Sequence, residues 1–171
     1  MVPQDTDELS SFRDAMASFP SGVTIVTTAD ADRRWWGFTA TSFCSVSMDP
    51  PLVLVCLARS AECFSKFEQA DGWIVHIIQP RHAELATLFA TRGADKFGGG
   101  SFAADECGLP VLDQAGVTLR CSSYAKVPGG DHLILVGRVE QTQMSAPELH
   151  PAVYFRRTFH RLSLNASPAR T

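Results

Sequence analysis

The chain has 171 residues, of which 45% are hydrophobic and 19% are charged, and this composition predicts one folded domain rather than a disordered chain. The formal net charge of −3 provides no basic surface for nucleic acid, so we expect no nucleic-acid partner. No apolar stretch is long enough to span a bilayer and the acidic, polar segment 1–11 is not a secretory signal, so we expect a soluble cytoplasmic protein without a membrane partner.

The first third of the chain predicts one helix followed by strands. Leu9, Phe12, Met16 and Phe19 recur at steps of three and four residues, which is typical of a short amphipathic helix, and Pro20 ends it. Runs rich in Val, Ile, Thr and aromatic residues then predict strands, the first of them followed by a turn at 30–32. These strands span 22–29, 35–39, 41–48 and 52–57.

The remainder of the chain predicts two helices and several further strands. Ser60 is expected to cap a helix that carries Phe64 and Phe67 and stops near Gly72, and Pro80 is expected to open a second helix. The stretch 98–110 is expected to be irregular. Strands are predicted at 73–78, at 117–127 and 132–140 as a hairpin around a Gly-Gly-Asp turn, and at 152–162 with a kink.

This series of elements favours a mainly β fold with a few helices, either a β-barrel or a sandwich. No G-x-G-x-x-G segment leads into a helix, so a Rossmann-type nucleotide site is not expected. The sequence suggests a flexible N-terminus (1–9), a single domain (10–162) and a C-terminal tail (163–171).

The segment 37–57, GFTATSFCSVSMDPPLVLVCL, is unusually rich in hydroxyl side chains before its apolar run. If the segment is extended, side chains alternate between faces, so Thr39, Thr41, Ser45 and Ser47 lie on the same side as Phe43. A hydroxyl-rich face without charges suits a flat, polar, partly anionic ligand. A solvated strand rich in Ser and Thr explains the pattern equally well.

Familiar catalytic motifs are absent from the sequence. It contains no G-x-S-x-G, Walker or H-E-x-x-H motif, and its five histidines have no metal-ligand spacing, so we expect no metal site. The five cysteines are irregularly spaced without a C-x-x-C pair, which favours core thiols in a reducing compartment. An enzyme with these features would take its chemistry from a cofactor.

Five segments, in this order, resemble the short-chain flavin reductases, the reductase components of two-component flavin-dependent monooxygenases. They are FRDAMASFPSGVTIVTT (12–28), the hydroxyl-rich segment 37–57, FATRGADKFGG (89–99), GGDHLILVGRV (129–139) and PAVYFRRTFHRL (151–162). The resemblance implies an FMN-binding split β-barrel with a Greek-key core that works as a homodimer. It also implies an NAD(P)H:flavin oxidoreductase that reduces FAD or FMN by hydride transfer and releases the reduced flavin to a separate monooxygenase.

The resemblance also implies a set of flavin-binding residues along the matching segments. Those near the ring and its edge are Phe38, Thr39, Ala40, Thr41, Ser42, Cys56, Leu57 and Ala58. Those expected near the ribityl chain or the phosphate are Ser45, Val46, Ser47, Ser60, Phe64, Lys96 and Phe97. His132 is the implied catalytic-site residue beside the nicotinamide, and Tyr154 and Arg156 complete the dinucleotide contacts.

Two of these residues also have a simpler interpretation. Lys96 either provides a phosphate counter-charge or is a solvated surface lysine, while Asp95 caps its turn. His132 either contacts the nicotinamide carboxamide or is a histidine at a strand start that hydrogen-bonds to solvent.

Two positions depart from the family pattern. The family often has Arg-Gly-x-Tyr where this chain has 156–159, Arg-Arg-Thr-Phe; NADH is the expected donor, and the doubled arginine adds the hypothesis that NADPH is accepted. His76 stands where the family commonly has asparagine, and we expect a hydrogen-bonded core histidine there rather than a flavin contact.

Two other functions remain open at this point: a pyridoxamine-phosphate-oxidase-like flavoenzyme and a non-enzymatic flavin-binding electron carrier. The Gly-Gly-Asp-His motif at 129–132 argues against the first, and the His132 and Arg156 motifs favour an enzyme over the second. No basic residue lies between Gly37 and Ala58, which favours an exchangeable flavin bound near micromolar affinity, about −8 kcal/mol. The sequence does not distinguish FMN from FAD.

Overall fold

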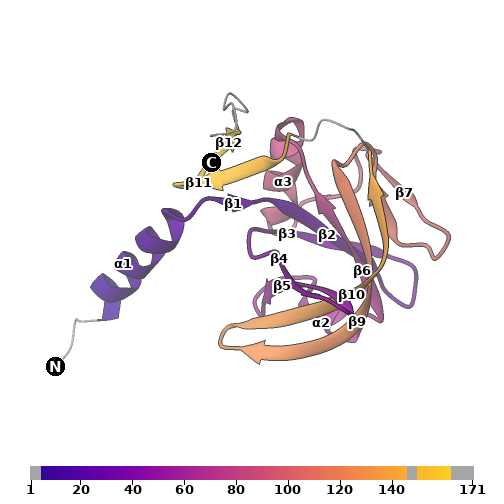
Figure 1. Ribbon diagram of the computed structural model, residues 1–171, viewed down its shortest axis with the longest axis horizontal. Coiled ribbons are helices and arrows are strands. Elements are labelled where there is room, and N and C mark those ends of the chain that lie inside the picture. Colours follow the sequence, from indigo (N-terminus) through magenta and orange to yellow (C-terminus); the bar gives the residue numbers. More distant parts are fainter. Residues whose placement is uncertain (1–4, 146–149, 163–171) are drawn as a thin grey trace, which may run out of the picture.

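The structure, a computed structural model, describes residues 5–145 and 150–162. A seven-stranded antiparallel sheet forms the body of the molecule (Figure 1). In spatial order its strands are β3 (Trp35–Ala40), β2 (Thr24–Ala29), β6 (Gly72–Ile77), β9 (Val117–Gly129), β10 (His132–Met144), β5 (Pro51–Ala58) and β4 (Cys44–Met48). The order shows that the chain crosses from one edge of the sheet to the other after β3, and that it returns after β5 to an interior position beside β2.

The sheet curls into a split barrel. β3 is an edge strand, yet it also packs against β5 near the opposite edge without sharing ladder hydrogen bonds with it. The strands form because their β-branched and aromatic side chains suit a pleated, buried surface: Thr24 to Thr28 of β2 are all buried. The predicted mainly β fold, a split β-barrel, is confirmed.

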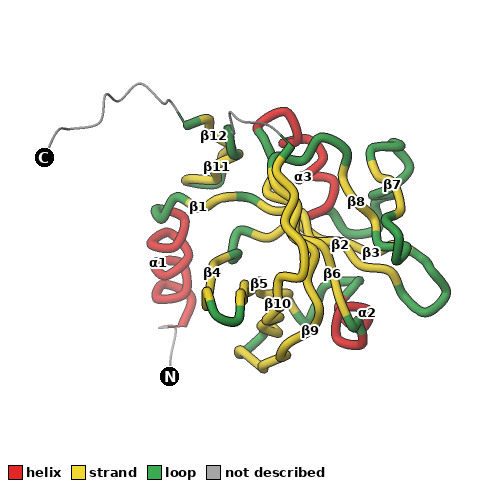
Figure 2. Tube along the Cα trace, turned by 45° about the vertical axis from the view of Figure 1, so that its right-hand side comes forward, coloured by secondary structure: helices red, strands yellow, loops and turns green. Residues whose placement is uncertain are grey.

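Two clusters of buried side chains hold the barrel and its helical cover together. Inside the barrel, Phe67 of α2 (Phe64–Gln69) packs with Trp73, Val75 and Leu135. The second cluster joins the start of β2 to the helix α3 (Ala83–Ala90) through side chains that include Ile25, Ala86 and Phe89. Figure 2 shows α2 and α3 against different parts of the barrel.

Gly37 allows α3 to approach β3 closely. A Cβ atom at this position would lie 2.6 Å from Cε1 of Phe89, so a larger residue would push the helix off the strand. Thr39 makes a second link between these elements, because its Oγ1 donates to the carbonyl oxygen of Ala86 at 2.5 Å. The end of α3 and the loop behind it are thereby fixed beside β3.

Several predicted elements differ from the observed ones. Ser60 does not cap α2; Cys63 occupies the N-cap position without a side-chain hydrogen bond. Pro80 opens a 3-10 turn, η1 (Pro80–His82), before α3 begins. The stretch 98–110, predicted to be irregular, contains β7 (Phe102–Ala104), which pairs with β8 (Pro110–Leu112).

The strand predicted at 152–162 is a short hairpin. It consists of β11 (Ala152–Phe155) and β12 (Thr158–Arg161), and β11 also pairs with β1 (Ser21–Gly22). Arg156 and Arg157 form its turn with φ of 48° and 63°, so the expected kink is a complete reversal of the chain.

The helix α1 (Asp5–Ala17) projects from the barrel in both Figure 1 and Figure 2. It begins earlier than predicted and includes residues 5–9 of the segment expected to be flexible; residues 1–4 and the predicted tail 163–171 lie outside the described residues. Its end is tied to the hairpin, since Nη2 of Arg157 lies 2.7 Å from Oδ1 of Asp14 and the N–H of Arg156 donates to the Ala17 carbonyl.

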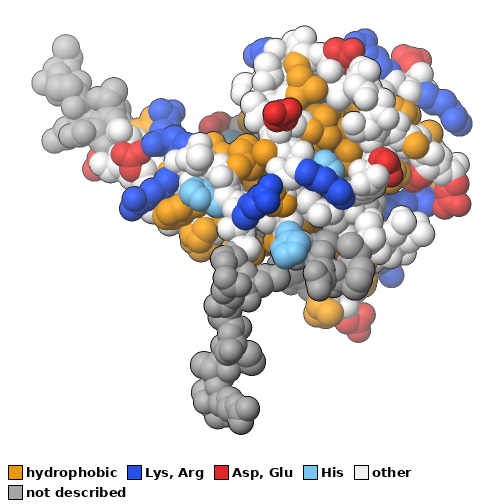
Figure 3. Space-filling model, turned by 90° about the horizontal axis from the view of Figure 1, so that it is seen from above, with side chains coloured by type: hydrophobic (Ala, Val, Ile, Leu, Met, Phe, Trp, Pro, Cys, Tyr) orange, Lys and Arg blue, Asp and Glu red, His pale blue; other side chains and the backbone are white. Residues whose placement is uncertain are grey.

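Seen from above, the projecting part carries hydrophobic side chains beside basic ones, which are arginines because α1 and the hairpin contain no lysine (Figure 3). Leu9, Phe12, Met16 and Phe19 are among the exposed large hydrophobic residues of the protein. None of the helices in 5–145 and 150–162 combines the length and the apolarity that crossing a membrane requires.

Candidate functional site

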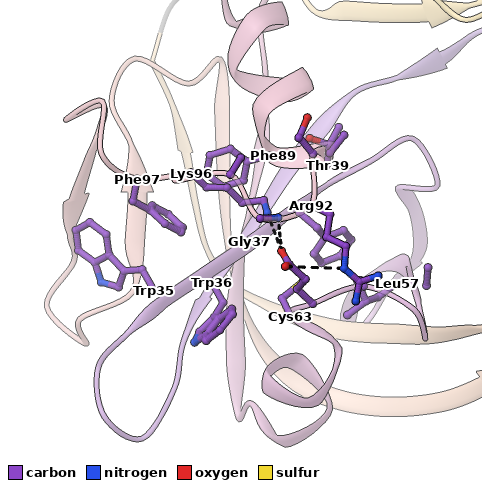
Figure 4. A pocket seen from close by; sticks show the side chains of 18 of the residues that line it. Trp35, Trp36, Gly37, Thr39, Leu57, Cys63, Phe89, Arg92, Lys96 and Phe97 are labelled. Atoms are coloured by element: carbon purple, nitrogen blue, oxygen red, sulfur yellow. Dashed lines mark hydrogen bonds and ion pairs between the residues drawn. The ribbon is translucent and has the colours of Figure 1, made fainter.

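An open pocket of about 1090 Å³ lies on the flank of the barrel (Figure 4). Its walls come from β3, the end of β5, the turn before α2, the end of α3 and the loop 91–97, with His132 of β10 at one side. The predicted site residues that line it are Phe38, Thr39, Cys56, Leu57, Ala58, Ser60, Lys96, Phe97 and His132.

The topology of the barrel explains why these distant segments meet. β10 pairs with β5 in a register that sets His132 opposite Ala58, at the end of β5 that faces the pocket. The packing of β3 against β5 brings Phe38 and Thr39 to the same opening. The pocket is thus a product of the barrel's curvature and of the close contact between α3 and Gly37.

The other predicted residues do not line this pocket. They are Ala40, Thr41, Ser42, Ser45, Val46, Ser47, Phe64, Tyr154 and Arg156. The strand predicted at 41–48 begins only at Cys44, because residues 41–43 form a bend, and β4 pairs irregularly with β5 between Ser45 and Ser47. The expectation of one continuous hydroxyl-bearing face from Thr39 to Ser47 is therefore wrong.

The Ser42 hydroxyl is engaged in a contact with the neighbouring strand. Its Oγ accepts the backbone N–H of Cys56 at 2.9 Å, so the hydroxyl anchors the bend to the neighbouring strand β5. Ser45 and Val46 are exposed on the edge strand β4. Phe64 lies on α2 beside the barrel core, with the Arg59 guanidinium 5.6 Å from its ring centre.

Tyr154 and Arg156 belong to the hairpin near α1. The Tyr154 ring packs against Phe159 with 5.2 Å between ring centres, and the Arg156 guanidinium lies over Phe155 at 5.3 Å. Within one chain, both side chains therefore pack against other residues of the hairpin.

The pocket contains more basic than acidic side chains. Arg33, Arg34, Arg92 and Lys96 line it, whereas the acidic lining residues are Glu62 and Asp95. Lys96 is only 14% exposed, so it is not the solvated surface lysine of the simpler interpretation. Asp95 accepts the N–H of Gly98 at 3.0 Å and caps its turn as expected. Arg33, Arg34 and Arg92 are exposed, so the pocket combines one partly buried cation with three at its rim, and this excess of positive charge favours an anionic ligand such as a phosphate ester.

Glu62 is the acidic group closest to these cations. Its Oε2 lies 3.8 Å from Nζ of Lys96 and accepts the N–H of Gly93 at 2.9 Å, and its Oε1 lies 3.9 Å from Nε of Arg92. The sequence analysis missed Glu62 and Arg92, and no spacing pattern marks Glu62, because its partners are about thirty residues away in sequence.

His132 is partly exposed at the pocket and is held by its neighbour in sequence. Its Nδ1 lies 2.7 Å from Oδ1 of Asp131, and this hydrogen bond lowers the pKa of the Asp131 carboxyl below its ordinary value. When Nδ1 donates to the carboxylate, Nε2 is the free ring nitrogen. The side chain can therefore offer one hydrogen-bonding atom to a ligand.

Flat aromatic surfaces surround the opening, and the sequence analysis passed over those of Trp35 and Trp36. The Trp35 ring packs edge-on against Phe97 at 5.6 Å. The Trp36 ring has the Arg34 guanidinium 4.8 Å from its centre, and its Nε1 donates to Asp30 at 2.9 Å. The doubled Arg-Arg-Trp-Trp sequence at 33–36 was the signal for a cationic, aromatic wall.

Two further groups are neutral and serve the core. Burial raises the pKa of the Cys63 thiol to about 11, so this pocket-lining cysteine is not a thiolate near neutral pH. His76 is fully buried outside the pocket; its Nδ1 lies 3.0 Å from the Ile25 carbonyl oxygen, and Nε2 accepts the N–H of Leu112 at 3.1 Å. The expectation of a hydrogen-bonded core histidine at this position is confirmed.

Comparison with known proteins places this chain in a family. Residues 16–163 match the family model described as a flavin reductase like domain. The chain is 44% identical over 151 residues to the NADH:riboflavin 5'-phosphate oxidoreductase of Streptomyces pristinaespiralis, a match that covers 88% of this chain and 86% of that protein. It is also 44% identical over 161 residues to the actinorhodin polyketide dimerase of Streptomyces coelicolor, with 93% and 90% covered.

A solved structure supports the same family assignment. The chain matches the NADH:FAD oxidoreductase SgcE6 of Streptomyces globisporus, solved in complex with NAD and FAD fragments, with a TM-score of 0.87 and 28% identity over 98% of this chain and 99% of that one. Because the family model covers most of the residues, including every segment that forms the pocket, this chain belongs to the flavin reductase like family.

Proposed function

We propose that this protein is an NADH:flavin oxidoreductase that reduces FMN or FAD by hydride transfer and releases the reduced flavin. The observation that carries the proposal is the pocket, in which flat apolar walls, the partly buried Lys96 and His132 meet within one opening. The names of the Streptomyces pristinaespiralis relative and of SgcE6 describe oxidoreduction between NADH and a flavin, in proteins of similar length.

The flavin ring fits best against the wall that Cys56, Leu57 and Ala58 form at the end of β5. These side chains carry no charge, so they leave ring recognition to hydrogen bonds from the backbone. The Thr39 hydroxyl is already committed to Ala86, so the ring carbonyls take donors other than this side chain. Lys96 provides the positive charge for a phosphate ester on the ligand.

His132 is placed for the nicotinamide side of the reaction. Hydride passes directly from the nicotinamide to the flavin, so the protein's task is to hold the two rings in contact rather than to supply a proton. The ring nitrogen left free by Asp131 is suited to a hydrogen bond with the carboxamide. His132 is therefore an orienting group that touches the substrate.

NADH is the donor that the chain supports. The doubled arginine raised the hypothesis of NADPH, but Arg157 pairs with Asp14 of α1 and neither arginine of the turn lines the pocket. FMN and FAD both stay within the proposal, because the relatives named above are an FMN and an FAD enzyme.

A second copy of the chain and a separate monooxygenase are the proposed partners, in the cytoplasm. The apolar side chains Leu9, Phe12 and Met16 of α1, which are 49% to 61% exposed, favour a homodimer in which this helix is covered. The reductase component of the trigonelline monooxygenase of Acinetobacter baylyi is 37% identical over 134 residues, although this chain spans only 43% of it. Sedimentation of the purified protein tests the dimer.

The test of the activity is the rate of NADH oxidation by the purified protein with added FMN, FAD or riboflavin. Many turnovers that saturate with flavin are expected. A protein that keeps its flavin and reduces it only once would instead be an electron carrier, and turnover of an amine substrate with bound FMN would indicate a pyridoxamine-phosphate-oxidase-like enzyme. The assay contains no polyketide, so turnover in it does not depend on the activity in the name of the Streptomyces coelicolor relative.

A further inference from the structure

Glu62 places a carboxylate among the cations of the pocket. It lies in the turn between β5 and α2, and its side chain reaches the loop that follows α3. The dashed lines in Figure 4 run from Arg92 and Lys96 to this one carboxylate, and the Gly93 N–H donates to it as well. Donors from three residues therefore converge on a single anion that belongs to the protein.

This donor set is of the kind that binds phosphate. It combines an ammonium, a guanidinium and a backbone N–H, all of which are common phosphate ligands. Gly93 has φ of 72° and there is open space where a side chain would stand, so no side chain at this position crowds the anion that its N–H binds. A phosphate monoester carries about two negative charges and three acceptor oxygens, against one charge and two oxygens for the carboxylate.

Two of the three contacts of Glu62 are long, and only the hydrogen bond from the Gly93 N–H, at 2.9 Å, has ordinary length. The distances of 3.8 and 3.9 Å to Lys96 and Arg92 exceed hydrogen-bond length, and the Glu62 side chain is 37% exposed. Such ion pairs are weak, so the main contact that the carboxylate gives up when it turns into water is one hydrogen bond, from the Gly93 N–H, which a phosphate oxygen can replace. Lys96 is far less exposed and remains in place to receive another anion.

We propose that Glu62 is a built-in competitor for the phosphate group of the bound substrate. In the ligand-free pocket its carboxylate occupies the site formed by Lys96, Arg92 and the Gly93 N–H; a substrate phosphate displaces it, and its return helps the product leave. The inference rests on the proposed reductase function. The phosphate is either that of the flavin or the pyrophosphate of the dinucleotide, and the experiment distinguishes them.

The test compares Glu62→Gln with the unaltered protein. Glutamine keeps the shape and an acceptor for the Gly93 N–H but removes the charge. Titration of the protein with FMN and with riboflavin, followed by flavin fluorescence, gives the two dissociation constants. FMN is expected to bind about three- to tenfold more tightly to the variant, with a steeper dependence on salt, while riboflavin binding is unchanged. Glu84→Gln, an exposed site on α3 outside the pocket, is the matched control and should change neither constant.

A second arm identifies which substrate supplies the phosphate. With riboflavin as the acceptor, a lowered KM for NADH in Glu62→Gln and an unchanged FMN constant would assign the site to the dinucleotide. Equal tightening of FMN and riboflavin, or no change for either flavin or NADH, would overturn the proposal.

Lys96→Gln provides an independent measurement if Glu62→Gln folds poorly. Lys96→Gln should weaken FMN binding, and adding it to Glu62→Gln should abolish the gain, because the two substitutions act on the same anion site. Additive effects would contradict the competition. An unaltered protein that binds no flavin and oxidises no NADH would overturn the proposed function along with the inference, whereas normal turnover with an unresponsive Glu62→Gln would overturn the inference alone.

Discussion

Two histidines show how the barrel interior and the pocket differ. His76 lies inside the fold with both ring nitrogens bonded to backbone groups of Ile25 and Leu112. His132 lies at the pocket with one nitrogen bonded to Asp131 and its side chain 42% exposed. The same residue type is thus a fixed structural bridge in one region and a group available to a ligand in the other.

The hydroxyl side chains show the same difference. Ser42 and Thr39 bond to the backbone of β5 and α3, so their hydroxyls serve the fold even though Thr39 lines the pocket. The charged groups of the pocket, in contrast, are held by long ion pairs. In this protein the groups free to recognise a ligand are those whose contacts within the fold are weak or incomplete.

The largest effect is expected from removing the interior histidine. In His76→Ala the Leu112 N–H and the Ile25 carbonyl lose their partner and a cavity remains, so the free energy of unfolding should fall by about 3 to 5 kcal/mol. Urea unfolding followed by circular dichroism measures this. A loss below about 1 kcal/mol would mean that the two regions differ less than the contacts indicate.

The second prediction concerns pH. Burial lowers the pKa of His76 from an ordinary value of 6.5 to about 4, so between these values the unfolded chain binds a proton that the folded protein does not. Stability is therefore complete above pH 6.5 and falls by about 3 kcal/mol as the pH approaches 4. Unfolding curves measured across this range test the slope.

The control for the pH prediction is His76→Asn, which puts at this position the amide that the family commonly has. The variant should be less stable at pH 7 but should lose much less stability on acidification. Part of the slope should survive, because burial also lowers the pKa of His82. An unchanged slope would assign the acid sensitivity to other groups.

The third prediction concerns the pocket histidine. His132→Ala should lower kcat/KM for NADH by about ten- to a hundredfold, the equivalent of one hydrogen bond to the substrate. Its unfolding free energy should change by less than about 0.5 kcal/mol, since the side chain is partly exposed. Steady-state rates at saturating flavin, together with urea unfolding, measure both. A large loss of stability without a loss of rate would make His132 a structural residue like His76.

The sequence predicted the strands of the barrel well, because apolar, β-branched runs determine which segments can be buried. It also predicted that His76 would be a core residue and that Lys96 and His132 would be near a ligand, and the structure brings the latter two to one pocket. Whether each predicted site residue contacts the flavin stays a prediction.

The parts that the sequence did not reveal depend on contacts between distant segments. The alternation rule placed Thr39, Thr41, Ser45 and Ser47 on one face, but the bend at 41–43 breaks the alternation. That bend is fixed by the bond between Ser42 and Cys56, which no local pattern signals. The ion pairs of Glu62 likewise exist only because the barrel brings the turn after β5 beside the loop that follows α3.

The smallest effect is expected from a hydroxyl that the resemblance assigns to the flavin ring. Ser42→Ala removes the acceptor of the Cys56 N–H, so stability should fall by about 1 kcal/mol. FMN affinity should change by less than about twofold, because the hydroxyl is engaged with β5 and does not line the pocket. Ser45→Ala, at an exposed position of β4, is the matched control and should leave stability within about 0.5 kcal/mol. If Ser42→Ala instead weakens FMN binding tenfold while leaving stability intact, then the bend must open toward the flavin when it binds, and the division between structural and ligand-binding hydroxyls would not hold at this position.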